Sequence, residues 1–198
     1  MLTQQHDLLL DLAHTSAEIT PLAQQRLRAA EALSEAALLE AQSALWTAQS
    51  ELAVRCGRAD NLPRPWPSTM PHAGLYALRT EKLPDGVAHS RAIRRLLDLI
   101  PHQTDSLQDH AAAVVEADFV RAVLTAAYET GGVPVDQVLD AIARQTQQTR
   151  AFLNGVTSYN QSIGQYVLAV LPPQVSSEAL VASLVVQRAK NKIEGAKQ

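Results

Sequence analysis

The sequence predicts an all-α fold of elongated antiparallel helical hairpins with coiled-coil packing, joined by a proline-rich extended crossover. The first observation is a stripe over residues 139–170 whose spacing alternates between three and four, the heptad pattern of a coiled-coil seam. The second is a Gly-Gly turn at residues 130–134, preceded by a similar stripe of smaller residues. Aromatic residues make up only 4% of the chain, which favours thin, closely packed helices over a large globular core.

Composition excludes several classes of function. The 198 residues carry a net charge of -3, so no basic field favours nucleic acid as a partner. Cys56 is the only cysteine, which excludes an intramolecular disulfide and fits either the cytosol or a periplasmic helical protein. No apolar run approaches the roughly 20 residues that a transmembrane helix requires.

Residues 1–57 form the first predicted segment, the first helical hairpin portion. Residues from about Gln4 to Val54 are expected to be mostly helical, with a break at Thr20-Pro21, since Thr suits an N-cap and Pro the first helical position. Ser34 is a candidate cap for the second part, and the helix is expected to end near Cys56-Gly57. Its predicted buried stripe is Leu38, Ala41, Leu45, Ala48 and Leu52.

Residues 58–89 are predicted to be an ordered extended crossover. The segment contains five of the ten prolines in the chain, a density that excludes a helix or a central strand. Its apolar residues are expected to hold it against the helices, with one short strand near Leu75 to Arg79. These apolar residues are Trp66, Leu75, Tyr76 and Leu78.

Residues 90–171 are predicted to form the second helical hairpin, with its tip near 130–135. A helix is expected from Ser90, a possible cap, to Ile100, and Pro101 is expected to break or kink it. The predicted stripe before the turn is Ala111, Val115, Phe119, Ala122 and Ala126. The predicted seam after the turn is Leu139, Ile142, Thr146, Thr149, Leu153, Val156, Asn160, Ile163, Val167 and Val170. Residues 172–198 are expected to be a short helix and a tail.

The hairpin tip carries a family resemblance. Tyr128-Glu129-Thr130-Gly131, followed by Val138-Leu139-Asp140-Ala141, resembles the periplasmic tip of TolC-like outer-membrane efflux proteins. In that family a Tyr-Glu-Ala-Gly turn is followed by a Leu-Asp-Ala helix start at the same distance. Further on, the run from Tyr159 to Tyr166 resembles the family's Tyr-Asn-x-x-Ile-x-x-Tyr ending.

The resemblance implies a function without catalysis. Three chains of such proteins form a passage for exported small molecules, and their helical tips meet a periplasmic adaptor protein. Carried over by position, Tyr128, Gly131, Val138, Leu139 and Asp140 are expected to lie at or beside that tip. The turn itself is expected to expose Gly132 and Pro134 as well, so the expected adaptor-contacting residues are Tyr128, Gly131, Gly132, Pro134 and Asp140. A homo-oligomer, a trimer by resemblance, is therefore expected. The outer membrane would be reached through a part not visible in this chain.

The sequence also departs from the family. Ala127 stands where the family usually has arginine, and Glu31 where a first repeat would have glycine. The paired outer-membrane strands of the family are not apparent between the helical segments. We therefore expect either the C-terminal portion of a longer protein or a divergent member with a reduced barrel. The alternative is a non-transport periplasmic or cytosolic coiled-coil protein with a structural or interaction role.

The expected location is the periplasm or outer membrane by resemblance. Met1 is not followed by a cationic start and an apolar stretch, so no signal peptide is visible. Either the protein is cytoplasmic, or Met1 is not the true start of an exported precursor. The resemblance favours the second interpretation.

No catalytic, cofactor or metal site is predicted. Asp7, Asp11 and His14 would share one helix face, but a solvated polar face is the preferred interpretation over a metal site. Cys56 lies at a helix end with no recognisable oxyanion element, so it is read as an idle or buried thiol. We therefore expect a protein that is not an enzyme.

Overall fold

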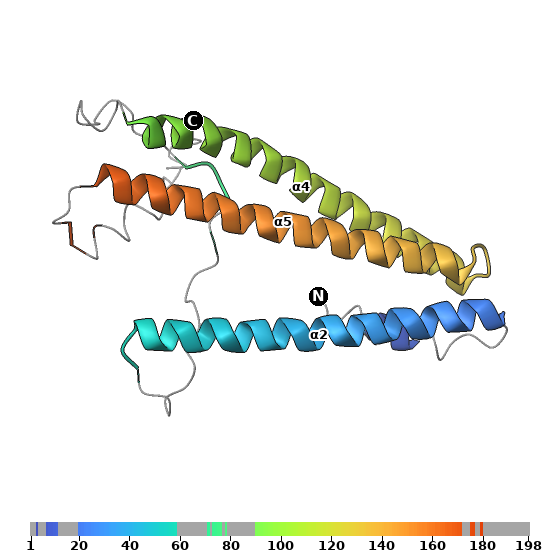
Figure 1. Cartoon of the computed structure of the whole chain (residues 1–198). Coiled ribbons are helices and arrows are strands. Elements are labelled where there is room, and N and C mark those ends of the chain that lie inside the picture. Colours follow the sequence, from blue (N-terminus) through green and yellow to red (C-terminus); the bar gives the residue numbers. More distant parts are fainter. Residues whose placement is uncertain are drawn as a thin grey trace, which may run out of the picture. The chain divides into compact units, whose positions relative to one another are not determined.

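The computed structural model describes residues 3, 7–11, 20–58, 71, 73–76, 78, 90–171, 175–176 and 179. Its three long helices are α2 (Pro21–Arg55), α4 (Arg91–Glu129) and α5 (Val135–Val170), as Figure 1 shows. Regular secondary structure in the described part of the chain is entirely helical, which confirms the predicted all-α class. No helix in these ranges combines the length and apolarity needed to cross a membrane.

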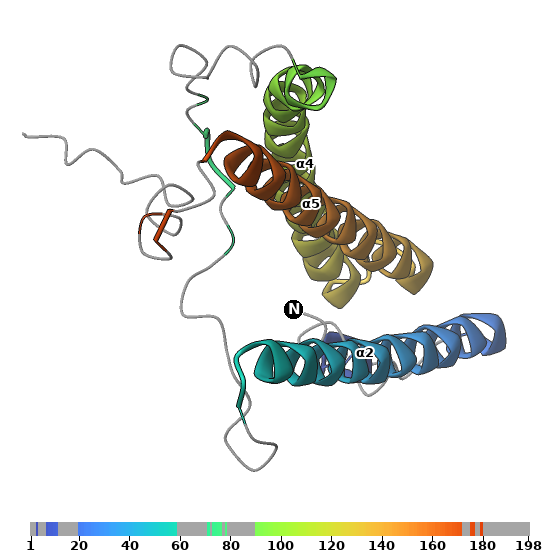
Figure 2. The ribbon, with the colours of Figure 1, turned by 60° about the vertical axis from the view of Figure 1, so that its left-hand side comes forward.

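The chain divides into two compact units that are discontinuous in sequence. We call the first the turn unit, because it contains the turn between α4 and α5; it comprises Met1–Met70 and Ala113–Gln148. We call the second the strap unit, after a short segment described below; it comprises Pro71–Ala112 and Thr149–Gln198. Helices α4 and α5 contribute to both units, because they are 39 and 36 residues long. In the turn unit, the end of α4 lies beside the start of α5, as Figure 2 also shows.

Local signals set both ends of α2. The Thr20 hydroxyl accepts a hydrogen bond from the Ala23 amide at 3.3 Å, and Pro21 opens the helix, which confirms the predicted cap. At the other end Cys56 is the C-cap, followed by Gly57 with a φ of 63°. The second predicted cap was wrong, because Ser34 lies inside one continuous helix.

The stripe predicted on α2 is only partly buried. Leu38 and Leu52 are partly covered, but Ala41, Leu45 and Ala48 are exposed. The burial on this helix centres on Leu27, which belongs to the core of the turn unit. That core consists of Leu9, Leu27, Val138 and Ile142.

The strap unit has the larger core, built from α4 and α5. Its buried residues are Ile93, Leu96, Ile100, Leu107, Val156, Tyr159, Ile163, Tyr166 and Val167. A short segment made of residues 73–76 and 78, here called the strap, packs against this core through Tyr76 and Leu78. Trp66, predicted to hold the same crossover in place, lies outside the described residues.

Two tyrosines of α5 attach the strap. The Tyr159 hydroxyl donates to the Gly74 carbonyl at 2.7 Å, and Tyr76 meets Tyr166 edge-on with ring centroids 6.4 Å apart. The predicted strand near Leu75 to Arg79 was wrong at every described position in it, namely Leu75, Tyr76 and Leu78, which have no strand structure. The Gly74 carbonyl of the strap accepts its hydrogen bond from the Tyr159 side chain and not from the backbone of a neighbouring strand.

Pro101 was predicted to break or kink its helix, and of these two alternatives the break does not occur. Helix α4 continues from Arg91 to Glu129 with Pro101 inside. A proline in a helix interior costs about 3 kcal/mol. Ile100 and Leu107, on either side, are buried in the same core, and their burial offsets that cost.

The buried stripe of α5 keeps the predicted spacing but lies one residue earlier than predicted at four positions. Ile142, Thr149, Val156 and Ile163 are buried as predicted, and so is Val167. Val170 is partly buried and packs on the core of the strap unit, also as predicted. At the four shifted positions the observed stripe has Val138, Gln145, Phe152 and Tyr159, and it continues with Tyr166. Leu153 was predicted to be in the seam but is 56% exposed.

The stripe predicted on α4 was wrong for most of its members. Val115 is 70% exposed and Phe119 65%, Ala122 and Ala126 are exposed, and Ala111 alone is partly buried. The observed stripe also alternates spacings of three and four. Its members, buried or partly buried, are Ile93, Leu96, Ile100, Gln103, Leu107, His110, Val114, Ala117, Arg121, Leu124 and Tyr128. The predicted and the observed stripes have the same alternating spacing, so the spacing alone does not select one of them.

Candidate functional site at the hairpin turn

The turn between α4 and α5 is a Schellman motif, which ends a helix with a residue in the left-handed region. Gly131 has a φ of 74°, its amide donates to the Tyr128 carbonyl at 2.9 Å, and the Gly132 amide donates to the Ala127 carbonyl at 2.8 Å. This confirms the predicted Gly-Gly turn. Only the first of the two glycines has a positive φ. At Gly132 the constraint is space, since a Cβ there would lie 3.2 Å from the Ala127 oxygen.

Side chains and backbone complete the hydrogen bonding of the turn. The Thr130 hydroxyl donates to the Ala127 carbonyl at 3.0 Å. On the other side, the Gln137 amide donates to the Pro134 carbonyl at 3.1 Å, at the start of α5. These bonds satisfy carbonyls at the end of α4 and an amide at the start of α5, so the turn is built as a defined structure.

The residues predicted to form the tip separate into two groups. Gly131, Gly132, Pro134 and Asp140 are exposed. Tyr128 is partly buried and packs on the core of the turn unit. Val138, expected beside the tip, is 0% exposed, and Leu139 is partly buried. Of the residues predicted to contact an adaptor, the accessible ones are therefore Gly131, Gly132, Pro134 and Asp140.

One contact at the tip was not predicted. Arg26 of α2 pairs with Asp136 in the first turn of α5 at 3.2 Å. Both side chains are more than one third exposed, so such a pair contributes at most about 1 kcal/mol. Asp136 could have been recognised in the sequence as a residue of a first helical turn, because an acidic side chain there suits the helix dipole. Its partner Arg26 could not, because that residue is far away in the sequence.

A polar layer interrupts the apolar seam near the tip. The buried Gln145 donates its amide to Asp118 Oδ1 at 2.7 Å, and Arg121 lies 3.0 Å from the same oxygen. Buried polar groups of this kind fix the register of paired helices at some cost in stability. Sequence reasoning missed this layer, since Asp118 and Gln145 are 27 positions apart.

The described residues contain no group of three or more His, Cys, Asp or Glu side chains placed to hold a metal ion. Asp7 and Asp11 are among those residues, whereas His14 lies outside them. Comparison with protein-family models, curated proteins and solved structures found no match for the chain.

The first testable prediction concerns Gly131. Replacing it with valine should lower the free energy of unfolding by about 2 kcal/mol, because a β-branched side chain is strained at positive φ. Urea unfolding of the purified chain measures the change. The matched control is Gly164→Ala inside α5, where a Cβ meets nothing within 4 Å. That control should raise the free energy of unfolding by up to about 1 kcal/mol. Equal effects at the two sites would contradict the turn geometry.

Proposed function

We propose that this chain is a component of a TolC-like outer-membrane efflux duct, a passive passage for exported small molecules. The observation that carries the proposal is an exposed, hydrogen-bonded turn at Gly131–Pro134 that closes two long helices. It occurs where the Tyr-Glu-x-Gly and Leu-Asp-Ala resemblance lies. In such a duct the chain acts by its shape and assembly, with no catalytic step.

The tip is the proposed contact for a periplasmic adaptor protein. Gly131 and Gly132 are exposed and lack side chains, so a partner can approach the backbone closely there. Asp140 supplies an exposed charge one helical turn beyond Gln137. Tyr128 takes a supporting role in this proposal, because its ring packs beneath the turn on the unit's core. Contact residues on a preformed turn lose little conformational entropy on binding.

Further parts of the proposal concern assembly and location. The duct requires a homo-oligomer, a trimer by resemblance, and a location in the periplasm and outer membrane. Exposed apolar residues support assembly: Phe119 and Val115 lie on the outer face of α4, and Trp46 of α2 is 59% exposed. Large apolar side chains grouped on a helix face are typical of interaction surfaces.

The same exposed apolar residues favour a second candidate, a coiled-coil structural or interaction protein without transport. This candidate needs the faces of α2 and α4 for assembly but has no use for the tip. The two proposals therefore differ in what a surface change at Asp140 does.

The second prediction is that Asp140→Lys weakens efflux while barely altering the fold. Asp140 is exposed, so the free energy of unfolding should change by at most about 0.5 kcal/mol, even with Arg144 one turn away. In the cells that produce the protein, dye retention should rise at an unchanged protein level in the outer membrane.

The matched control is Asp109→Lys, an equal charge change on the exposed face of α4 in the strap unit. It should leave dye retention at the wild-type value. Normal export by the Asp140 variant at normal protein level would argue against the tip as the adaptor contact. Unaltered dye retention on deletion of the whole gene would favour the structural protein.

A further inference from the structure

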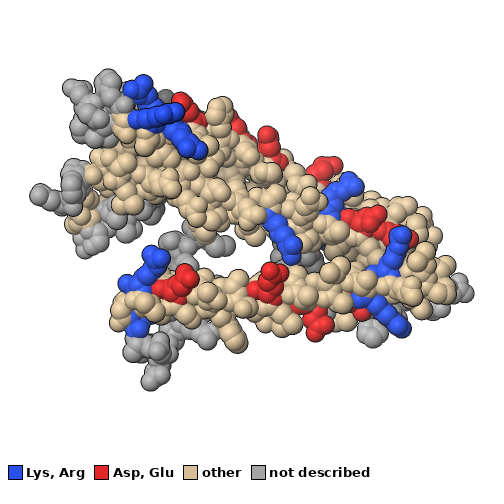
Figure 3. Space-filling model, in the orientation of Figure 1, with Lys and Arg blue, Asp and Glu red and all other residues tan. Residues whose placement is uncertain are grey.

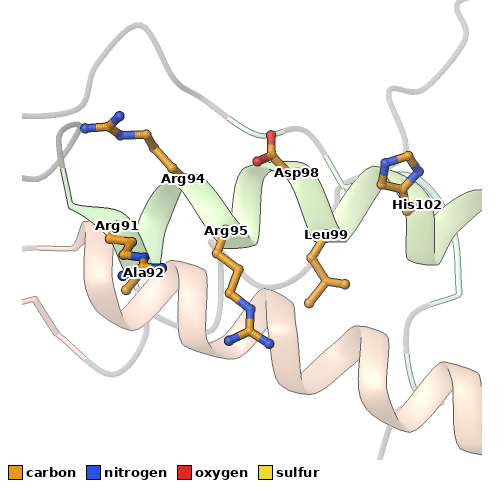
Figure 4. A pocket seen from close by; sticks show the side chains of 7 residues that line it. All are labelled: Arg91, Ala92, Arg94, Arg95, Asp98, Leu99 and His102. Atoms are coloured by element: carbon orange, nitrogen blue, oxygen red, sulfur yellow. The ribbon is translucent and has the colours of Figure 1, made fainter.

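Helix α4 begins with three arginines that share one open groove. Arg91, Arg94 and Arg95 occupy the first five positions of the helix. Together with Ala92, Asp98, Leu99 and His102 they line a groove of about 970 Å³, shown in Figure 4. We call it the arginine groove. Figure 3 shows this gathering of positive side chains at the start of α4.

The charge of the arginine groove is strongly unbalanced. Its described lining has three arginines and a single carboxylate, that of Asp98. Neither Arg91 nor Arg95 forms an ion pair with a described residue. The helix dipole also disfavours positive charge in the first turn, so a bound anion would relieve two sources of repulsion at once.

The three arginines favour an oxygen anion as the ligand. The planar guanidinium group presents a rigid fork of donors that matches the oxygens of a carboxylate or a phosphate in pairs. Arg91, Arg95, Leu99 and His102 follow one another at spacings of four, four and three, which places them along one stripe. The seam residues Ile93, Leu96 and Ile100 occupy the opposite, buried face.

The apolar members of the groove favour a lipid over an acidic peptide. Leu99 is 37% exposed and lies beside the cationic side chains, with Ala92 near the helix start. A stripe that combines arginines with an exposed leucine suits the boundary between headgroups and acyl chains. Such a surface gains from phosphate contacts and from apolar burial together.

We propose that the arginine groove binds the phosphate headgroup of an anionic phospholipid and attaches the start of α4 to a membrane surface. This depends on the proposed duct function only for the presence of a membrane beside the hairpin in the cell. Binding should be screened by salt, because the attraction acts between exposed charges.

The test is co-sedimentation of the purified 198-residue chain with vesicles of phosphatidylglycerol and phosphatidylcholine, against phosphatidylcholine alone. The variant R91Q/R94Q/R95Q should lose on the order of a hundredfold in partitioning to anionic vesicles, at about fivefold per arginine. The matched control R28Q/R144Q/R150Q removes the same charge from exposed positions elsewhere and should lose less than about threefold.

A second comparison addresses the basic residues Arg188, Lys190 and Lys192 near the C-terminus of the sequence. The variant R188Q/K190Q/K192Q should keep most of the wild-type partitioning. Complete loss in this variant would overturn the proposal, as would equal losses in the two arginine variants. Wild-type binding that is no stronger to anionic than to neutral vesicles would overturn it too.

Separate measurements distinguish a loss of folding from a loss of lipid binding, and the lipid site from the duct. Far-ultraviolet circular dichroism should show equal helicity for all variants. If the triple variant lost helicity, the single variant R95Q would replace it in the vesicle test. We expect R95Q to lower partitioning to anionic vesicles about fivefold, and unchanged partitioning would contradict the site. Tip-dependent efflux without vesicle binding would overturn the lipid site and leave the duct proposal standing. Vesicle binding together with unaltered efflux on deletion of the gene would overturn the duct proposal and leave the lipid site standing.

Discussion

The packing of α4 against α5 along matched heptad stripes is the constraint on which the rest of the structure depends. In the strap unit, Tyr159 is fully buried between the helices and still reaches the strap with its hydroxyl. Gly155 lets the helices approach closely, because a Cβ there would lie 3.0 Å from Leu107 Cδ2. Burial of the seam also offsets the cost of Pro101 inside α4, where proline removes a backbone hydrogen bond.

The turn and the polar layer give that packing its register. In the turn unit, the Schellman motif fixes where α5 begins relative to the end of α4. The layer of Asp118, Arg121 and Gln145 then matches only one alignment of the two helices. A slip by one heptad would leave the buried Gln145 amide without its carboxylate acceptor, which costs about 1–3 kcal/mol. The exposed tip is thus held by interactions on its inner side.

Sequence reasoning succeeded where structure is set locally and failed where two faces compete. The cap at Thr20 and the left-handed glycine at Gly131 depend on a few neighbouring residues, so their signals could be read directly. The choice between Phe152 and Leu153 depends on which face meets α4, and alternating apolar residues admit both answers. For the same reason Phe119 was assigned to the seam although it faces outward.

The candidate site was predictable in its position and less so in its composition. Turn residues are exposed because connecting segments run over the surface, which correctly placed Gly131, Gly132 and Pro134. Burial of Val138 and the contact between Arg26 and Asp136 depend on α2, which lies far away in sequence. Asp140 remains exposed, one residue beyond the partly buried Leu139.

The register of the seam is the central claim, and the adjacent pair Phe152 and Leu153 tests it most directly. Urea unfolding of Phe152→Ala and Leu153→Ala compares two apolar truncations at neighbouring positions on one helix. Phe152 packs on the core of the strap unit, so its truncation should lower the free energy of unfolding by about 3 kcal/mol. Leu153 is 56% exposed, so its truncation should cost no more than about 0.5 kcal/mol. The opposite order would contradict the observed seam and restore the stripe that includes Leu153.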